Sequence, residues 1–390
     1  MIFVLALSAG CSTAVAPGQP RDSVSAPRVQ TTPAVSVPTL EFPVAEAAPV
    51  TATPTLAENV PPGKPDTGNA HIALILPLNI PAFKIPAEAV KQGVLTASKA
   101  QAGSPPIQVY PTSEEINDVL AVYQQAVNNG ARVIVGPLTK TAVTALADSN
   151  LVSVPTIALS VPDVEITNRN LFLFGLSLDA EARQVAQYMR REGRRSVLII
   201  SSPSTLGKRL KTAFSETWQR EGGNIAGRFT FSASTDLNTL QDSASKVQAD
   251  AVFLALSAQD AGLVHPYLPS NLASYATSQV FTGYAAPNIV DLGGVRFLDM
   301  PWMLQADHPA VMVYSHAPKT LSADGERLYA MGIDAYRLAQ LFYQGAISSS
   351  GTILDGVTGQ IGLIRQQFTR ALTAAEFQSN AVVVLDNAQP

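Results

Sequence analysis

From His71 onward, short apolar runs alternate with longer amphipathic segments, and this alternation restricts the fold more than any other feature of the sequence. The runs are rich in β-branched or aromatic residues and are bounded by Pro, Gly or Asn, which predicts buried parallel strands. They lie at 72–76, 107–110, 132–135, 156–159 and 171–174. The segments between them carry apolar residues at helical spacing and predict helices at 87–99, 114–128 and 138–148.

A second series of the same kind follows Gly175. Helices are predicted at 179–191, 206–220 and 237–247, and strands at 196–200, 228–231, 251–256 and 279–282. Because the alternation occurs twice, we predict an α/β protein with two doubly wound, Rossmann-like lobes rather than one long sheet. The predicted division is 71–175 for lobe 1, 176–294 for lobe 2, 295–345 for a return to lobe 1, and 346–390 for a closing hairpin and C-terminal segment.

One late segment, 327–343, is predicted to be a long helix with a single apolar stripe. Leu328, Met331, Ala335, Leu338 and Phe342 fall on that stripe, so we expect the helix to bury one face against a sheet. Farther along, two glycines at 356 and 359 bracket a predicted turn before an alternating run, as a hairpin requires.

The first residues, MIFVLALSAGC, form an apolar run followed by three small residues directly before Cys11. This order resembles a bacterial lipobox and predicts a signal peptide at 1–10, lipidation of Cys11 and anchoring to a membrane. The alternative is an ordinary secretory signal with a coincidental cysteine. Cys11 is the only cysteine of the chain, so an intramolecular disulfide is impossible.

Between Cys11 and residue 70 the sequence is rich in Pro, Ala, Val, Thr and Ser. Proline at this density removes backbone donors and disfavours both helices and central strands. We therefore predict a disordered, partly polyproline II tether, which reaches up to about 180 Å if it is extended at about 3.1 Å per residue.

A search for catalytic or cofactor chemistry returns no convincing motif. The four histidines, at 71, 265, 308 and 316, lack metal-ligand spacing, and no G-x-S-x-G sequence occurs. The turn at 135–141 lacks the glycines of a phosphate-binding loop. We therefore predict no catalytic residue, no metal site and no cofactor.

Charge argues against nucleic acid as a partner. The formal net charge is -4, and Lys and Arg look scattered along the sequence rather than gathered on one face. Charged pairs such as Glu181 with Arg183 are expected on solvated helix surfaces.

Open α/β sheets bind ligands at the carboxyl ends of their strands. The candidate cleft residues therefore lie in the predicted strand-end loops, and they are Pro77, Leu78, Gly136, Pro137, Ser160, Ser201 and Ser202. The serine hydroxyls could hold the carboxylate of an amino acid, but the sequence offers no clear acid for its ammonium group. A plain strand-to-helix turn is the alternative at Gly136 and Pro137, and no ligand is assigned to the cleft.

Several stretches resemble the carboxyl-terminal domain of the LpoA family of lipoproteins, also called LppC. The most specific is RLYAMGIDAYRLA, from Arg327 to Ala339, which is similar to that family's late helix. Further similarity lies at 133–138, 174–183, 295–302, 354–359, 370–372 and Phe377. Members in enteric bacteria carry a large helical-repeat domain before this module, where this chain has the Pro-rich segment.

The resemblance implies a periplasmic-binding-protein type I fold and a non-catalytic lipoprotein of the outer membrane that faces the periplasm. It also implies a partner, a class A penicillin-binding protein whose peptidoglycan synthesis this chain would activate by contact. Two alternatives stay open: a solute-binding or sensing lipoprotein of the amino-acid (Leu/Ile/Val) receptor type, and a structural module associated with the cell wall.

Overall fold

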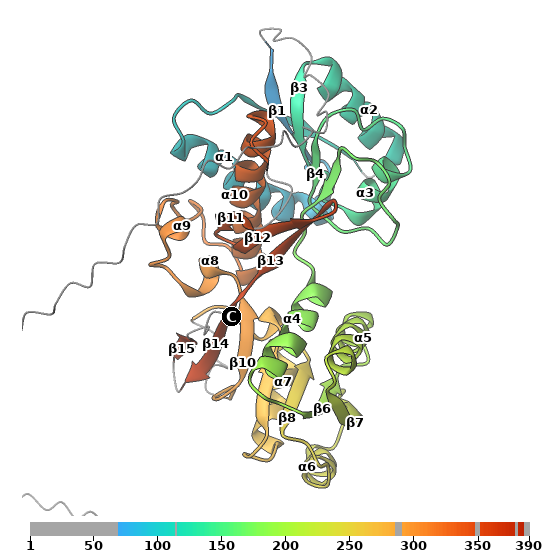
Figure 1. Ribbon diagram of the computed structural model, residues 1–390, viewed down its shortest axis with the longest axis vertical. Helices are drawn as coiled ribbons and strands as arrows, with labels where there is room; N and C mark the ends of the chain where they lie inside the picture. The colour runs from blue at the N-terminus through green and yellow to red at the C-terminus, as the bar shows by residue number, and fades with distance from the viewer. Residues whose placement is uncertain (1–68, 114, 285–290, 348–351, 379–380, 386–390) are drawn as a thin grey trace, which may run out of the picture. The chain divides into compact units, whose positions relative to one another are not determined.

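A computed structural model describes residues 69–113, 115–284, 291–347, 352–378 and 381–385. The predicted signal peptide, Cys11 and the predicted tether up to residue 68 lie outside the described residues. Figure 1 shows two separate sheets, each flanked by helices, so the predicted pair of α/β lobes is confirmed.

The first sheet has eight strands in the order β11-β12-β13-β5-β4-β3-β1-β2. Its first five strands in sequence pair in parallel, as buried apolar runs separated by helices require. They are β1 (His71–Leu76), β2 (Ile107–Pro111), β3 (Ala131–Val135), β4 (Thr156–Ala158) and β5 (Leu171–Leu173). The helices of this lobe that lie between them are α1 (Lys84–Ala100), α2 (Ile116–Asn128) and α3 (Lys140–Ala147).

The second sheet has seven strands in the order β15-β14-β10-β9-β8-β6-β7. Its parallel strands are β6 (Ser196–Ser201), β7 (Asn224–Thr230), β8 (Ala251–Ala255), β9 (Ala273–Ala276) and β10 (Arg296–Asp299). The helices are α4 (Leu178–Arg191), α5 (Thr205–Arg220), α6 (Leu237–Ser245) and α7 (Ala258–Val264). Serine side chains cap the amino termini of α4, α5 and α7, which fixes where these helices begin.

Two predictions for this lobe are wrong. The strand expected at 279–282 is not formed, because Ser278–Val280 is a turn of 3-10 helix and the strand comes earlier, at β9. The sequence of β9 is Ala-Ser-Tyr-Ala. It contains no β-branched residue, so the sequence pattern did not predict a strand there. The lobe boundary expected at 295 is also misplaced, because β10 pairs with β9 and belongs to the second sheet.

The predicted closing hairpin is instead a set of five strands shared between both sheets. The strands β11 (Thr352–Gly356), β12 (Gly359–Ile364) and β13 (Gln367–Ala371) extend the first sheet. After Leu372 the chain enters β14 (Thr373–Gln378) and β15 (Ala381–Val384), which extend the second sheet. The chain therefore passes between the lobes three times: after β5, after β10 and at Leu372.

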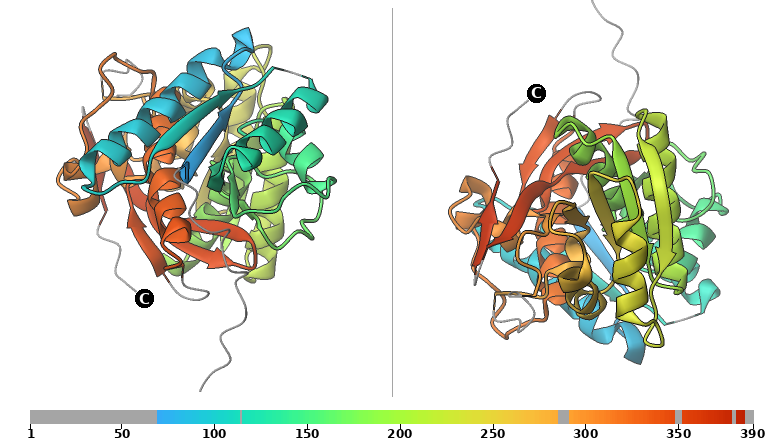
Figure 2. Two further views of the ribbon diagram at one scale, coloured as in Figure 1. Left: turned by 90° about the horizontal axis from the view of Figure 1, so that it is seen from above. Right: turned by 90° about the horizontal axis from the view of Figure 1, so that it is seen from below.

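After β10, the short helices α8 (Pro301–Leu304) and α9 (Pro309–Met312) lead into α10 (Ala323–Tyr343). The predicted stripe of α10 is buried or half-buried, but α10 is also buried on its other sides and packs most extensively on α1. Figure 2 shows these two helices side by side, one in blue and one in orange. A Cβ added at Gly93 of α1 would lie 2.0 Å from the Tyr329 carbonyl oxygen, and one at Gly332 of α10 would lie 2.2 Å from the Val90 carbonyl oxygen. Only glycine at both positions permits this close helix crossing.

Candidate functional site

The structure brings five of the seven candidate cleft residues to one edge of the first sheet. Pro77 and Leu78 follow β1, Gly136 and Pro137 follow β3, and Ser160 lies shortly after β4. These three strands are neighbours in the sheet and run in parallel, so their carboxyl ends meet. Pro77, Gly136 and Pro137 are buried, whereas Leu78 and Ser160 are half-buried.

The backbone conformation and packing of the turn at residue 136 require a glycine there. Gly136 has a φ of 109°, and a Cβ there would lie 2.0 Å from the Ile75 carbonyl oxygen. Its amide donates to the Ile157 carbonyl, and the Pro137 carbonyl accepts from the Leu159 amide, so the turn is held between β1 and β4. The Gly136 amide and the Pro137 carbonyl are therefore already hydrogen-bonded to β4 and to the residue that follows it.

The remaining two candidates, Ser201 and Ser202, lie at the carboxyl end of β6 in the second sheet. Ser201 is 1% exposed, and the Ser202 hydroxyl is 2.7 Å from that of Ser204, whose side chain also accepts from the Gly207 amide at the start of α5. The Ser202 hydroxyl therefore contacts the serine whose side chain caps α5. A binding role for all seven residues stays a prediction.

Among the residues that the structure describes, no group of three or more His, Asp or Glu side chains could hold a metal ion. In the same part of the chain, no helix combines the length and apolar character that crossing a bilayer requires. The prediction that charged pairs lie on solvated surfaces is wrong for one important residue. Glu181, in the first turn of α4, is 4% exposed.

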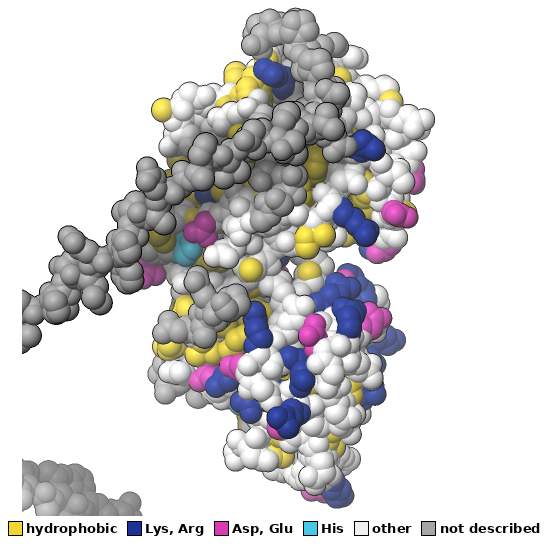
Figure 3. Space-filling model, in the orientation of Figure 1, with side chains coloured by type: hydrophobic (Ala, Val, Ile, Leu, Met, Phe, Trp, Pro, Cys, Tyr) yellow, Lys and Arg dark blue, Asp and Glu magenta, His cyan; other side chains and the backbone are white. Residues whose placement is uncertain are grey.

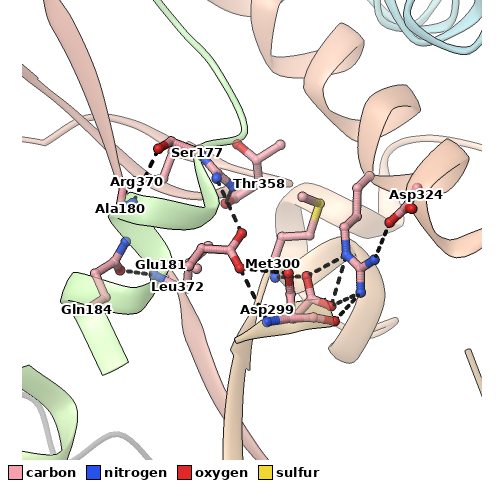
Figure 4. A network of polar contacts seen from close by, with 12 residues as sticks. Ser177, Ala180, Glu181, Gln184, Asp299, Met300, Asp324, Thr358, Arg370 and Leu372 are labelled. Carbon is pink, nitrogen blue, oxygen red and sulfur yellow. Dashed lines mark hydrogen bonds and ion pairs between the residues drawn. The ribbon is translucent and has the colours of Figure 1, made fainter. Parts of the chain in front are cut away.

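Glu181 belongs to a buried polar network where the chain passes between the lobes (Figure 4). Glu181 follows the first passage, Asp299 ends β10 at the second, and Arg370 precedes the third. The Glu181 carboxylate accepts from the Ser278 amide and hydroxyl at 3.3 and 2.7 Å, and it lies 3.9 Å from the Arg370 guanidinium. We call Glu181, Asp299, Arg327, Asp334 and Arg370 the hinge network.

Arg327 of α10 makes the densest contacts of the hinge network. Its Nε and Nη2 donate to both Asp299 oxygens at 2.7–3.2 Å. Nη2 also donates to the carbonyls of Ser278 and Phe281, at 3.0 and 2.8 Å. The planar guanidinium thereby joins a helix of the first lobe to the Asp299 carboxylate of β10 and to two carbonyls of the segment 278–281, a geometry that lysine does not reproduce.

Two further contacts hold the third passage and the turn between β11 and β12. Gln184 of α4 accepts from the Leu372 amide at 3.2 Å. Asp334, which is 0% exposed, accepts from the Thr358 amide and hydroxyl at 2.7 Å each and from the Val357 amide at 3.2 Å. The carboxylate of α10 therefore holds the turn between β11 and β12. A Cβ at Gly356 would lie 2.5 Å from Asp334 Oδ2, which explains the glycine there, while the positive φ expected of the turn occurs at Gly359.

Burial dominates the electrostatics of the hinge network. Removal from water raises the pKa of the Glu181 carboxyl, and the nearby Arg370 only partly opposes that rise. Burial likewise raises the pKa values of Asp299 and Asp334, against the attraction of Arg327 and Arg337 respectively. Burial lowers the pKa of the Arg370 guanidinium. Because unpairing a buried charge costs about 3–5 kcal/mol, the network favours one arrangement of the three passages.

The hinge network was not predicted from the sequence, although the pattern of α10 indicates that two of its charged residues are buried. Arg327, Asp334 and Leu338 lie on the same side of α10 as the buried Met331, so two charged residues occupy positions of the apolar stripe. Charges at such positions are rarely solvated, and they indicate buried partners. No comparable signal identifies the partners themselves, which come from distant parts of the sequence.

The two lobes joined by three passages define the class: a periplasmic-binding-protein type I fold. The family model described as "LppC putative lipoprotein" matches residues 65–243 and 228–380, and the chain belongs to this LppC family. The stretches that resemble LppC proteins include Asp334 and the turn that it binds, so the resemblance rests on parts that contact each other.

Comparison with known proteins agrees. The penicillin-binding protein activator LpoA of Enterobacter sp. (strain 638) is 27% identical over 341 residues, which are 76% of this chain and 46% of that protein. This chain thus spans about half the length of the curated relatives that it matches. The LpoA C-domain of Haemophilus influenzae, described as a regulator of PBP1A, has a TM-score of 0.68 at 24% identity and covers 81% of this chain and 99% of its own.

A second solved structure belongs to a differently described protein. It comes from Chromobacterium violaceum and is described as "a putative branched-chain amino acid ABC transporter". It is 37% identical, has a TM-score of 0.69, and covers 79% of this chain and 99% of its own. The fold is therefore shared by a protein described as a regulator of PBP1A and by one described as a putative ABC transporter.

Proposed function

We propose that this chain is a cell-envelope lipoprotein that activates a class A penicillin-binding protein by contact and catalyses no reaction itself. The observation that carries the proposal is the match to the LppC family across both lobes, together with relatives named penicillin-binding protein activators. The hinge network supports it, because buried ion pairs at all three passages favour a body of constant shape, which suits a docking module.

Activation requires the chain to bind the active conformation of the synthase more tightly than its resting conformation, because equal affinity would shift no population. We propose anchoring through lipidated Cys11 to the outer membrane, with the folded lobes facing the periplasm. A Pro-rich tether between the anchor and the lobes would raise the concentration of the module near the wall.

The test is a glycan polymerisation assay with a purified class A penicillin-binding protein from the same cell. Titration with the folded chain is expected to raise the polymerisation rate until the effect saturates, while the chain alone releases no product. The heat-unfolded chain is the matched control. An unchanged rate at saturating concentration, or turnover by the chain alone, would contradict the proposal.

A second function, binding of an amino acid between the lobes, is favoured by one observation at Asp179. This residue lies in the first turn of α4, where one carboxylate oxygen contacts Arg209 and the other is buried without a partner among the described residues. We propose Asp179 as the acid for an ammonium group, with the half-buried hydroxyls of Ser160 and Ser202 taking the carboxylate.

Calorimetry with Leu, Ile, Val and a panel of other amino acids tests this second function. Binding by the native chain that is lost in Asp179→Asn, but kept in Asp260→Asn at the start of α7, would support it. No heat with any member of the panel would contradict it.

A further inference from the structure

The helices α4 and α5 gather basic residues that look scattered in the sequence. Between residues 178 and 221 there are nine Lys or Arg and only five Asp or Glu, although acids outnumber bases in the whole chain. The two helices pack against each other. Figure 3 shows Lys and Arg side chains spread over this part of the second lobe.

Most of the five acids do not oppose this positive charge at the surface. Glu181 is buried in the hinge network, and Glu192 forms an ion pair with Arg296 at 2.8 Å. Asp179 is paired with Arg209. Only Glu216 and Glu221 remain exposed, and neither forms an ion pair with a described residue.

The basic residues, in contrast, are mostly free of carboxylate partners. Arg183 and Arg191 are exposed two helical turns apart on α4, with the exposed Gln187 between them, so they form one stripe. Lys208 and Lys211 lie in the first turns of α5, exposed and half-buried respectively. None of these four cations forms an ion pair within the described part of the chain. We call Arg183, Arg191, Lys208 and Lys211 the basic face.

The residues around the basic face indicate which kind of polyanion it fits. A helix that docks on a membrane adds exposed Trp, Phe or Leu side chains to its cations. Neither α4 nor α5 exposes a large apolar side chain. Arginine forks bind carboxylates, as they bind phosphates, through two parallel hydrogen bonds, so the missing apolar side chains are what favours a protein surface over a membrane.

We propose that the basic face is a docking surface for an acidic protein surface, and, resting on the proposed function, that this surface belongs to the activated synthase. Complementary charge of this kind steers association and makes it dependent on ionic strength, because exposed charges are screened beyond about 8 Å in physiological salt. The hinge network would hold α4, and with it the basic face, in a constant position relative to the first lobe.

The test compares two charge reversals of equal size in the full chain. Arg183→Glu with Arg191→Glu alters the basic face, and Lys246→Glu with Lys319→Glu alters exposed cations elsewhere by the same net charge. Arg183→Gln with Arg191→Gln removes the charge without reversing it, and circular dichroism confirms that each variant is folded. Binding to the immobilised class A synthase is measured between 50 and 500 mM salt, with vesicles of anionic phospholipid and isolated wall sacculi as further ligands.

Reversal on the basic face is expected to weaken synthase binding on the order of tenfold or more, mainly through slower association, and to flatten its salt dependence. The control reversal should bind as the native chain does. If the native chain binds and activates the synthase but both reversals leave binding unchanged, the docking surface is refuted and the proposed function stands. If the basic face affects only vesicles or sacculi, an acidic protein partner is refuted. If the native chain fails to bind the synthase, both proposals fall.

Discussion

Replacing Asp334 by asparagine tests whether a buried carboxylate of α10 holds the β11–β12 turn. The carboxylate accepts from the Thr358 amide, the Thr358 hydroxyl, the Val357 amide and, at 3.0 Å, the Arg337 guanidinium. An asparagine side chain has one oxygen, so at least two of these bonds are lost and an NH2 group faces donors. At about 1.5 kcal/mol or more for each bond to a charged acceptor, the expected loss of stability is about 3 kcal/mol. Asparagine is neutral, so the variant no longer bears the desolvation cost of a buried carboxylate, and this gain offsets part of any larger loss of stability.

The assay is denaturant unfolding of Asp334→Asn followed by circular dichroism, with a thermal scan beside it. A loss of about 3 kcal/mol corresponds to a fall in Tm of about 5 °C for a folded part of this size, at about 2.1 cal/mol/K of unfolding entropy per residue. Hydrogen exchange adds a local measurement, because the Val357 and Thr358 amides should lose their protection.

Asp324→Asn is the matched control for this variant. Asp324 lies on the same helix and binds Arg327, also three residues later and also at 3.0 Å, but its side chain is 91% exposed. An exposed pair of this kind contributes less than about 1 kcal/mol. Equal losses in the two variants, or unchanged exchange at Val357 and Thr358 in Asp334→Asn, would refute the reasoning.

Three further variants probe the fold. Gly332→Ala should lower the free energy of unfolding by about 2 kcal/mol, because its Cβ would meet the Val90 carbonyl oxygen at 2.2 Å and force α1 and α10 apart. Thr212→Ala, at an exposed position, is the control, and equal Tm values for the two variants would contradict this. Because the folded state raises the pKa of Glu181, it binds that proton more readily than the unfolded chain does, so the contribution of this residue to stability should rise as pH falls through the raised pKa. Glu181→Gln should reduce that rise in unfolding midpoints, and an identical pH profile would argue against burial as its cause. Arg327→Lys should lose about 2–3 kcal/mol, since lysine cannot reach Asp299 and two carbonyls at once, and a native-like midpoint would show that the fork geometry is unimportant.

The local signals in the sequence predicted most of the regular structure. The apolar runs at β1, β3, β6 and β8 are buried strands, and their helical connections dictate parallel pairing. The prediction was wrong at β9, whose short side chains resemble those of a loop, and in the final segment, whose alternation does not reveal which sheet each strand joins.

The sequence predicted those candidate cleft residues that lie at the carboxyl ends of strands. Pro77, Gly136 and Ser160 meet at one edge because β1, β3 and β4 are neighbours, which the β-α order already favoured. The buried, unpartnered oxygen of Asp179 was not predicted, since a first-turn acid on an amphipathic helix is ordinarily a solvated residue or a favourable helix-terminus charge.

The sequence by itself determined the β-α alternation, the strand ends, the glycines of tight turns and the resemblance to the LppC family, because each depends on residues that are close in the chain. Only the tertiary structure decided that Glu181 is buried while Arg183 is exposed, although both lie on one turn of α4. The partners of Glu181, which are Ser278 and Arg370, come from distant parts of the sequence. The physical reason is that desolvation and ion pairing depend on distances in space, which are established only when the three passages come together.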